Sequence, residues 1–208
     1  MKKIDNFAIL MTIVVILSVF SACDSSAANT PELSPEQIRN YRQEYPITGL
    51  NGDGAMDGIQ PSMELAKGLA SFWAQVKCVG QAEDIHVKGT AIDNDFYCYR
   101  MEVIKSFGGS LKVGDKFRLI VHYDDKSVAP DFLNGRTWII GAMPTVFPQL
   151  SEEEKADLYT FYAGLCFYVT DDGYVLSLSG SENKEHFSGI SLTEWEKRFK
   201  EVEAAKVQ

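Results

Sequence analysis

Oxygen-bearing side chains lie close together near residue 50, where the sequence reads GLNGDGAMD from Gly49 to Asp57. Asn51, Asp53 and Asp57 follow one another in this segment, and Gly54 lies directly after Asp53. Amide and carboxylate oxygens are the ligands that Ca²⁺ prefers, and a glycine permits the sharp turn that wraps a loop around the ion. The pattern therefore favours calcium as the metal that this segment would bind.

The same segment resembles the calcium-binding loop of EF-hand and dockerin proteins, with Asn51, Asp53 and Asp57 at loop positions three, five and nine. Gly49 and Gln60 stand at positions one and twelve, where that loop has carboxylates. The missing carboxylate at position twelve would have supplied two of the oxygens. Two hypotheses stay open: a calcium loop in a calcium-stabilised structural surface protein, and a solvated Asp/Gly turn in front of a helix.

Other residues offer little for catalysis. His86, His122 and His186 are far apart and form no HExxH or HxH spacing. The sequence contains no GxSxG, GxGxxG or GxxxxGK[ST] motif, which disfavours an α/β-hydrolase and the nucleotide-binding classes that use those loops. We therefore expect no catalytic residue. The alternative is a cell-envelope hydrolase with an unrecognised carboxylate pair, whose separation a sequence does not reveal.

The first 23 residues, MKKIDNFAILMTIVVILSVFSAC, have the layout of a secretory signal peptide. Two lysines precede an apolar run from Phe7 to Phe20, and two small residues precede Cys23. A cysteine directly after such a site resembles the lipobox of bacterial lipoproteins, although Phe20 stands where that family prefers leucine. The alternative is an uncleaved transmembrane anchor.

The lipobox resemblance implies a location. Residues 1–22 would be removed as the lipoprotein signal peptide, and Cys23 would become the lipid-attachment residue, acylated with palmitate-type chains. Two acyl chains hold a protein durably on a membrane. The resemblance thus places the mature chain at the cell surface, outside the cytoplasm, anchored to the outer face of the bacterial cytoplasmic membrane.

The charge balance narrows the range of partners. The chain has 20 lysine and arginine residues against 29 aspartate and glutamate residues, a formal net charge of −9 at pH 7. Such a chain repels nucleic acid, because the phosphate backbone attracts basic surfaces. We expect no nucleic-acid partner, contact with the membrane through the lipid anchor, and a cell-wall or protein partner.

Three cysteines follow Cys23, and an odd number does not pair completely within one chain. Cys78, Cys98 and Cys166 are interpreted as small, mostly buried apolar side chains. A Cys78–Cys98 bridge between neighbouring strands is the alternative. No Cys/His cluster indicates zinc, so we expect no cofactor unless the segment near residue 50 binds calcium.

The elements around these residues can be outlined from periodicity. Residues 23–44 are polar and predict a flexible tether, with a short helix at Pro35–Tyr41 capped by Ser34. Residues 45–208 are expected to form one domain, with a helix after Ser62 and a last helix with an apolar stripe from Leu192 to Val202. Between these helices, alternating apolar runs predict strands near residues 73–79, 96–107, 116–123, 136–143, 158–170 and 174–179.

Short strands separated by turn residues are typical of a small antiparallel barrel. The runs FYCYRMEVIKSFGGSLKVGDKFRLIVHY, LNGRTWIIGAM and CFYVTDDGYVLSLSG resemble the OB-fold-like barrel of the netrin and tissue-inhibitor-like group. Across residues 45–203 the chain resembles surface lipoproteins of Gram-positive bacteria that carry this domain. The resemblance implies a mainly β, α+β fold: a small antiparallel OB-like β-barrel with one N-terminal and one C-terminal helix.

We expect the domain to act as a non-catalytic binding or interaction module. Its ligand surface is predicted on a barrel face or on the long loops Asp124–Gly135 and Pro144–Asp157. Aromatic residues are dense on two predicted strands, from Phe96 to Tyr99 and from Tyr159 to Tyr168. They are interpreted either as an ordinary β core or as an exposed face that stacks on sugars or packs against a partner.

Overall fold

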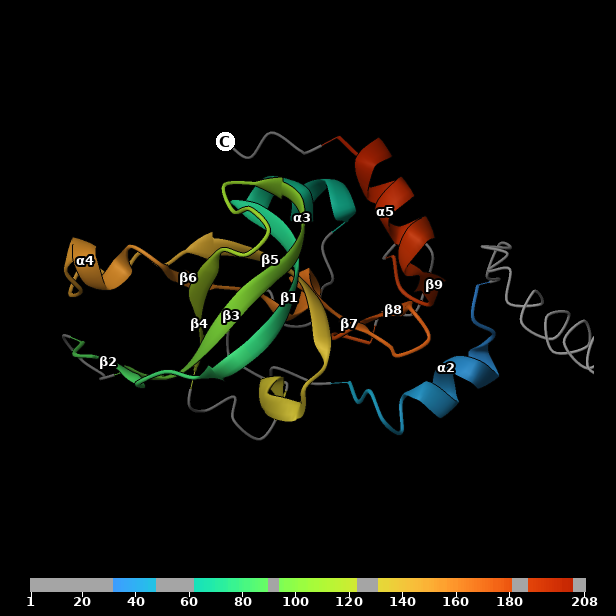
Figure 1. Ribbon diagram of the computed structural model, residues 1–208, viewed down its shortest axis with the longest axis horizontal. Helices are drawn as coiled ribbons and strands as arrows, with labels where there is room; N and C mark the ends of the chain where they lie inside the picture. The colour runs from blue at the N-terminus through green and yellow to red at the C-terminus, as the bar shows by residue number, and fades with distance from the viewer. Residues whose placement is uncertain (1–31, 48–61, 90–93, 123–130, 181–186, 204–208) are drawn as a thin grey trace, which may run out of the picture. The chain divides into compact units, whose positions relative to one another are not determined.

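The structure is a computed structural model, and it describes residues 32–47, 62–89, 94–122, 131–180 and 187–203 (Figure 1). Residues 32–208 form one compact unit. The helices of the described part are α2 (Pro35–Tyr41), α3 (Met63–Leu69), α4 (Glu152–Lys155) and α5 (Leu192–Glu201), with short 3₁₀ turns at η2 (Phe132–Asn134) and η3 (Ala163–Leu165). The strands are β1 (Phe72–Gln81), β2 (Ile85–Val87), β3 (Asn94–Gly109), β4 (Lys116–His122), β5 (Thr137–Pro144), β6 (Leu158–Thr160), β7 (Cys166–Val169), β8 (Tyr174–Ser177) and β9 (Ile190–Ser191).

Local sequence explains how the helices begin. The side chains of Ser34, Ser62, Ser151 and Ser191 each accept a hydrogen bond from a backbone N–H in the first turn of the helix that follows. A serine in this position satisfies one of the N–H groups that a helix start leaves without an intrahelical partner. The predicted helix at Pro35–Tyr41 and its cap are confirmed.

Within the described residues the nine strands form one sheet, and five of them close into a ring in the order β1-β3-β4-β6-β5. The closing contact is the pairing of β5 with β1, from Phe72 opposite Ala142 to Lys77 opposite Thr137. All neighbours in this ring are antiparallel except β4 and β6, which are parallel. A ring with an odd number of strands has to contain a parallel pair, because directions cannot alternate all the way round. The expectation of a purely antiparallel sheet is therefore wrong at this pair, while the mainly β, α+β class is confirmed.

The strands of the ring bury alternate side chains in one large apolar cluster. On β4, Phe117, Leu119 and Val121 belong to this cluster, as the period of two predicts. β1 and β5 bury both faces, since Phe72 and Trp138 lie in the first cluster while Trp73 and Ile139 lie in a second one. This double burial explains why the sequence of β5 is almost continuously apolar.

The second cluster lies under the C-terminal helix. Trp195 and Phe199 of α5 stack on each other, with ring centroids 4.8 Å apart and planes 10° from parallel. Both pack against Trp73, at 6.1 and 5.3 Å between centroids. The predicted apolar stripe of this helix is confirmed, because Trp195 and Phe199 are buried and Leu192 and Val202 pack against the same cluster.

The predicted single strand at residues 158–170 is two strands, β6 and β7, separated by η3. Both pair with the same strand, β5: Thr160 lies opposite Met143, and Cys166 lies opposite Ile140. The residues between them exceed what β5 offers as partners, so the chain takes up the surplus in the 3₁₀ turn. Periodicity alone does not show such an interruption.

Residues that precede the first strand in the sequence also pack against the sheet. The backbone N–H of Leu33 donates to the carbonyl of Gly189 at 2.9 Å, and Arg42 donates to the carbonyl of Ser177 at 2.7 Å. Tyr45, 2% exposed, packs edge-on against Tyr168, with centroids 5.5 Å apart. The domain is predicted to begin at residue 45, but residues before this position already pack against the sheet.

Candidate functional site

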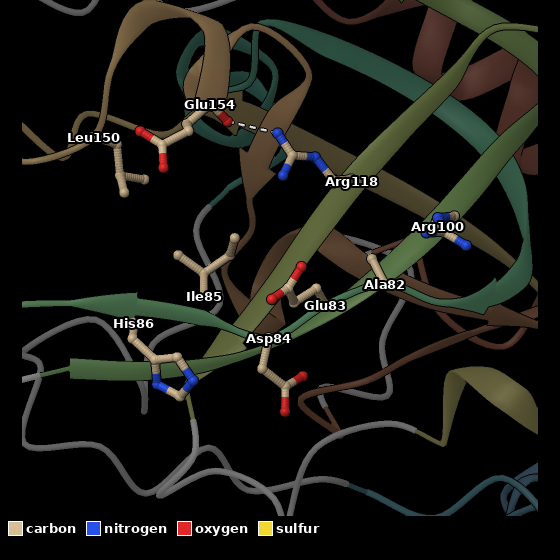
Figure 2. A pocket seen from close by; sticks show the side chains of 9 residues that line it. All are labelled: Ala82, Glu83, Asp84, Ile85, His86, Arg100, Arg118, Leu150 and Glu154. Carbon is tan, nitrogen blue, oxygen red and sulfur yellow. Dashed lines mark hydrogen bonds between the residues drawn. The ribbon is translucent and has the colours of Figure 1, made fainter.

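A hollow of about 490 Å³ lies where β2, β3, β4 and the turn before α4 meet (Figure 2). We call it the β2–α4 cleft; it is lined by residues 82–86 together with Arg100, Arg118, Leu150 and Glu154. In Figure 1, β2 and α4 lie at the same end of the sheet. The volume falls in the range of about 300–1,000 Å³ that is usual for small-ligand sites.

Arg118 is held firmly at one side of this cleft. It lies on β4 between the buried residues Phe117 and Leu119, so the alternation of the strand turns it to the opposite face of the sheet. Its Nε and Nη2 donate to one carboxylate oxygen of Asp157 at 2.8 and 2.6 Å, and Nη2 also donates to the carbonyl of Glu154 at 2.6 Å. The bond to Asp157 raises the pKa of the guanidinium above its ordinary value. Arg118 is therefore a fixed cation.

Arg100 lies directly opposite Arg118 in the register of β3 and β4. Its side chain is exposed, and within the described part of the chain no hydrogen bond or ion pair engages it. Like charges directly opposite each other on adjacent strands destabilise a sheet. Placing these two arginines opposite each other thus lowers the stability of the sheet, and within the described part of the chain the ion pair of Arg118 with Asp157 offsets this loss.

Acidic side chains on the other sides of the cleft are mostly engaged. The carboxylate of Glu154 accepts from the backbone N–H and the hydroxyl of Ser151 at 2.8 and 2.7 Å, which lowers the pKa of this carboxyl. Asp84 accepts from Gln81 at 3.4 Å. Glu83 has no hydrogen bond or ion pair with the described residues, and Figure 2 shows its carboxylate between Ala82 and Ile85.

His86 lies at the outer end of the cleft and pairs with an acid. Its Nδ1 is 2.6 Å from an Oδ1 of Asp95, which faces it across β2 and β3. This hydrogen bond raises the pKa of His86, and the nearby charges of Asp84 and Glu83 add to the effect. The ring is exposed, and none of the described lining residues is a serine, threonine or cysteine. His86 and Asp95 thus form an exposed histidine–aspartate pair.

An apolar cluster forms the base of this region. Cys98, Ile120 and Leu158 are buried, and Ile85 and Leu150 pack against them from the lining of the cleft. Burial raises the pKa of the Cys98 thiol to about 11, so this cysteine stays protonated and unreactive near neutral pH. The cleft thus offers aliphatic contact as well as charge.

The three described cysteines are free. Cys98 and Cys166 are buried, and Cys78 is half-buried with its Sγ 3.5 Å from the carbonyl oxygen of Gly80. No Cys78–Cys98 bridge forms, and the interpretation of these residues as small apolar side chains holds for the two buried ones. Among the described residues, no group of three or more His, Cys, Asp or Glu side chains is placed to hold a metal ion.

Several predicted site residues lie outside the residues that the structure describes. Cys23, the predicted lipid attachment, and Asn51, Asp53 and Asp57, the predicted calcium ligands, all belong to this group. So does His186, and of the loop Asp124–Gly135 only residues 131–135 are described. No described helix is both long enough and apolar enough to cross a membrane.

The loop Pro144–Asp157 is predicted as a ligand surface, and two of its residues, Leu150 and Glu154, line the cleft. The aromatic residues mainly build the core: Phe167 and Tyr168 are buried, and of the set between Tyr159 and Tyr168 only Tyr162 is exposed, at 39%. Sequence reasoning missed Arg100, Arg118 and residues 82–86. A basic residue at an outward position on each of two adjacent strands is the signal that could have found the arginines.

Comparisons of the chain with protein-family models, with curated proteins and with solved structures found no match.

Proposed function

We propose that the chain is an OB-type barrel that acts as a non-catalytic binding module, with its ligand in the β2–α4 cleft. OB folds are five-stranded, partly open barrels that bind ligands on the face of their second and third strands, next to the loops joining strands one to two and four to five. In chain order the ring here consists of β1, β3, β4, β5 and β6. A ring of five strands supports the assignment.

One observation carries the proposal: the cleft lies where that architecture binds ligands. Arg100 and Arg118 come from β3 and β4, the second and third strands of the ring. Residues 82–86 belong to the connection between the first and second strands, and Leu150 and Glu154 to the connection between the fourth and fifth. All of these segments line one hollow.

Binding without catalysis fits the chemistry of the lining. A glycoside hydrolase needs a carboxylic acid with a raised pKa beside a second carboxylate. Glu154 has a lowered pKa and is turned to Ser151, while Glu83 is exposed. The described lining offers cations, hydrogen-bond donors and aliphatic contacts, which suit recognition.

A screen of envelope components tests this function. The full chain, purified in detergent, would be titrated with peptidoglycan stem peptides and wall oligosaccharides while backbone amide resonances are followed by NMR. A bound component should shift the resonances of residues 82–86, Arg100 and Arg118, and Arg100→Ala should weaken binding. Arg39→Ala is a matched control, because Arg39 is an exposed arginine on α2. Shifts confined to another surface, or turnover of a component, would overturn the proposal.

We also propose that the module is anchored outside the cytoplasm through acylated Cys23. The support is the charged leader, the apolar run and the small residues before this cysteine. A chain with a Cys23→Ser change should lose its acyl chains and leave the membrane fraction, since acyl chains supply the membrane affinity. Mass spectrometry and fractionation measure this, and a Cys23→Ser chain that still fractionates with membranes would favour a transmembrane anchor instead.

A further inference from the structure

Two arginines from adjacent strands line the β2–α4 cleft. Arg100 on β3 and Arg118 on β4 lie directly opposite each other in register, and both line the hollow. Because opposed like charges cost folding free energy, an arrangement of this kind gains stability when an anion lies between them. The register of β3 with β4 therefore favours the binding of a negatively charged group near these two arginines.

Arg118 is oriented before any ligand arrives. Asp157 and the carbonyl of Glu154 occupy its Nε and Nη2, and Nη1 donates no hydrogen bond to a described residue. In Figure 2, the remaining terminal nitrogen points toward the middle of the labelled residues. A fixed guanidinium loses little conformational entropy when it binds an oxyanion. Arg100, exposed and without a partner among the described residues, supplies the adjustable second contact.

Asp157, outside the lining, pairs with Arg118, and no described carboxylate pairs with Arg100. Glu154 is bonded to Ser151, and His86 is bonded to Asp95 on the far side. Glu83 is the carboxylate that lies near the arginines without an ion pair to a described residue. Its charge opposes an incoming anion, so its removal should favour binding.

We propose that the cleft binds an anionic group, a phosphate or a carboxylate, between Arg100 and Arg118, with the uncharged part of the ligand along Ile85 and Leu150. This inference rests on the proposed function, because it names the chemistry of the ligand for the same cleft. The guanidinium of Arg100 matches the oxyanions of these classes through paired hydrogen bonds, and Nη1 of Arg118 supplies a further donor. Ile85 and Leu150 are half-buried aliphatic side chains beside them, which accept an apolar or sugar-like chain.

Opposite responses of two variants test the inference. The full chain in detergent would be titrated with pyrophosphate and, separately, with citrate at constant ionic strength, while the Nε–H resonances of the arginines are followed by NMR. We expect saturable shifts at Arg118, binding about tenfold weaker in Arg100→Ala, and binding about threefold tighter in Glu83→Gln. Arg39→Ala should match the unmodified chain. A preference for pyrophosphate identifies a phosphate ligand, and a preference for citrate a carboxylate ligand.

Two results would overturn the inference: no saturable shift with either probe at millimolar concentration, or equal affinities in the unmodified chain, Arg100→Ala and Glu83→Gln. A neutral wall oligosaccharide that shifts residues 82–86 in the same samples would then leave the proposed binding function standing. Failure of both anions and of every envelope component in the cleft would remove the proposed function as well. Backbone spectra of each variant show whether its fold is intact.

Discussion

Arg118 donates to a single oxygen of Asp157 through two nitrogens, Nε at 2.8 Å and Nη2 at 2.6 Å. The contact joins the middle of β4 to the residue just before β6, next to the parallel pairing of Arg118 with Leu158. The backbone N–H of Arg118 also donates to the carbonyl of Asp157 at 2.7 Å. One residue pair thus fixes both the parallel pairing of β4 with β6 and the orientation of a cation in the cleft.

We expect Asp157→Asn to lower the free energy of unfolding by about 1 kcal/mol, because hydrogen bonds to charged groups are stronger than neutral ones and Asp157 is half-exposed. Urea denaturation measures the change. Glu153→Gln is the matched control, since Glu153 lies in the same segment, Pro144–Asp157, is exposed, and its side chain has no hydrogen bond or ion pair with a described residue. Equal stabilities of the two variants would show that the Asp157 charge contributes nothing.

A second prediction concerns pH and His86. Asp95 raises the folded-state pKa of His86 above its ordinary value of about 6.5, so the pair stabilises the fold at pH values below the ordinary pKa. This contribution disappears as the pH rises through the folded-state pKa. In an NMR titration of the imidazole, Asp95→Asn should lower the pKa of His86 more than Asp84→Asn does, because Asp84 acts only through its charge. An unchanged pKa in Asp95→Asn would contradict the assigned hydrogen bond.

Neighbouring glycines at the end of β3 should respond differently to alanine. A Cβ at Gly109 would overlap the carbonyl oxygen of Ser71 and the Cα of Phe72, and its φ of +96° disfavours side chains. A Cβ at Gly108 meets nothing within 4 Å, at a φ of +155°. We expect Gly109→Ala to lower the free energy of unfolding by about 2–4 kcal/mol and Gly108→Ala by about 1 kcal/mol, measured by thermal and urea denaturation. Equal losses would mean that backbone conformation, and not the close approach of β1, decides the effect.

The parts of the fold that depend on local pattern could be predicted from the sequence. The serine caps, the alternation of Phe117, Leu119 and Val121, and the positive φ of Gly114 all follow from neighbouring residues. The parallel pairing of β4 with β6 depends on closure of the ring, which local pattern does not contain. The break between β6 and β7 depends on the number of β5 residues that can pair with them, which local pattern does not contain either.

The candidate site was less accessible to sequence reasoning. Arg100 and Arg118 read as ordinary outward residues of two strands, and only the register of β3 with β4 brings them opposite each other. Residues 82–86 carry no motif, and their place in the cleft follows from the pairing of β2 with the start of β3. By contrast, the length of the loop Pro144–Asp157 predicts a ligand surface there, and this loop supplies Leu150 and Glu154 to the cleft.

Tyr41 connects α2 to the hairpin of β7 and β8. Its hydroxyl donates to a carboxylate oxygen of Asp172 at 2.7 Å, and its ring packs against Tyr45 and Tyr174, with centroids 6.1 and 6.0 Å away. The hydrogen bond to Asp172 raises the pKa of Tyr41 to about 12, since ionisation would place two anions side by side. The neutral hydroxyl is therefore the form that holds α2 in place.

A final prediction follows from the sign of this shift. The folded-state pKa lies above the unfolded value of about 10, so the contact stabilises the fold below pH 10 and this contribution is lost as the pH rises toward 12. We expect Tyr41→Phe to lower the free energy of unfolding by about 0.5 kcal/mol at neutral pH, because the contact is largely exposed, and to flatten the decline between pH 10 and 12. The difference between the ultraviolet titrations of the two chains isolates the phenol of Tyr41. A midpoint near 10 in that difference would mean that Asp172 does not hold the hydroxyl, and that α2 relies on the apolar contacts of its tyrosines alone.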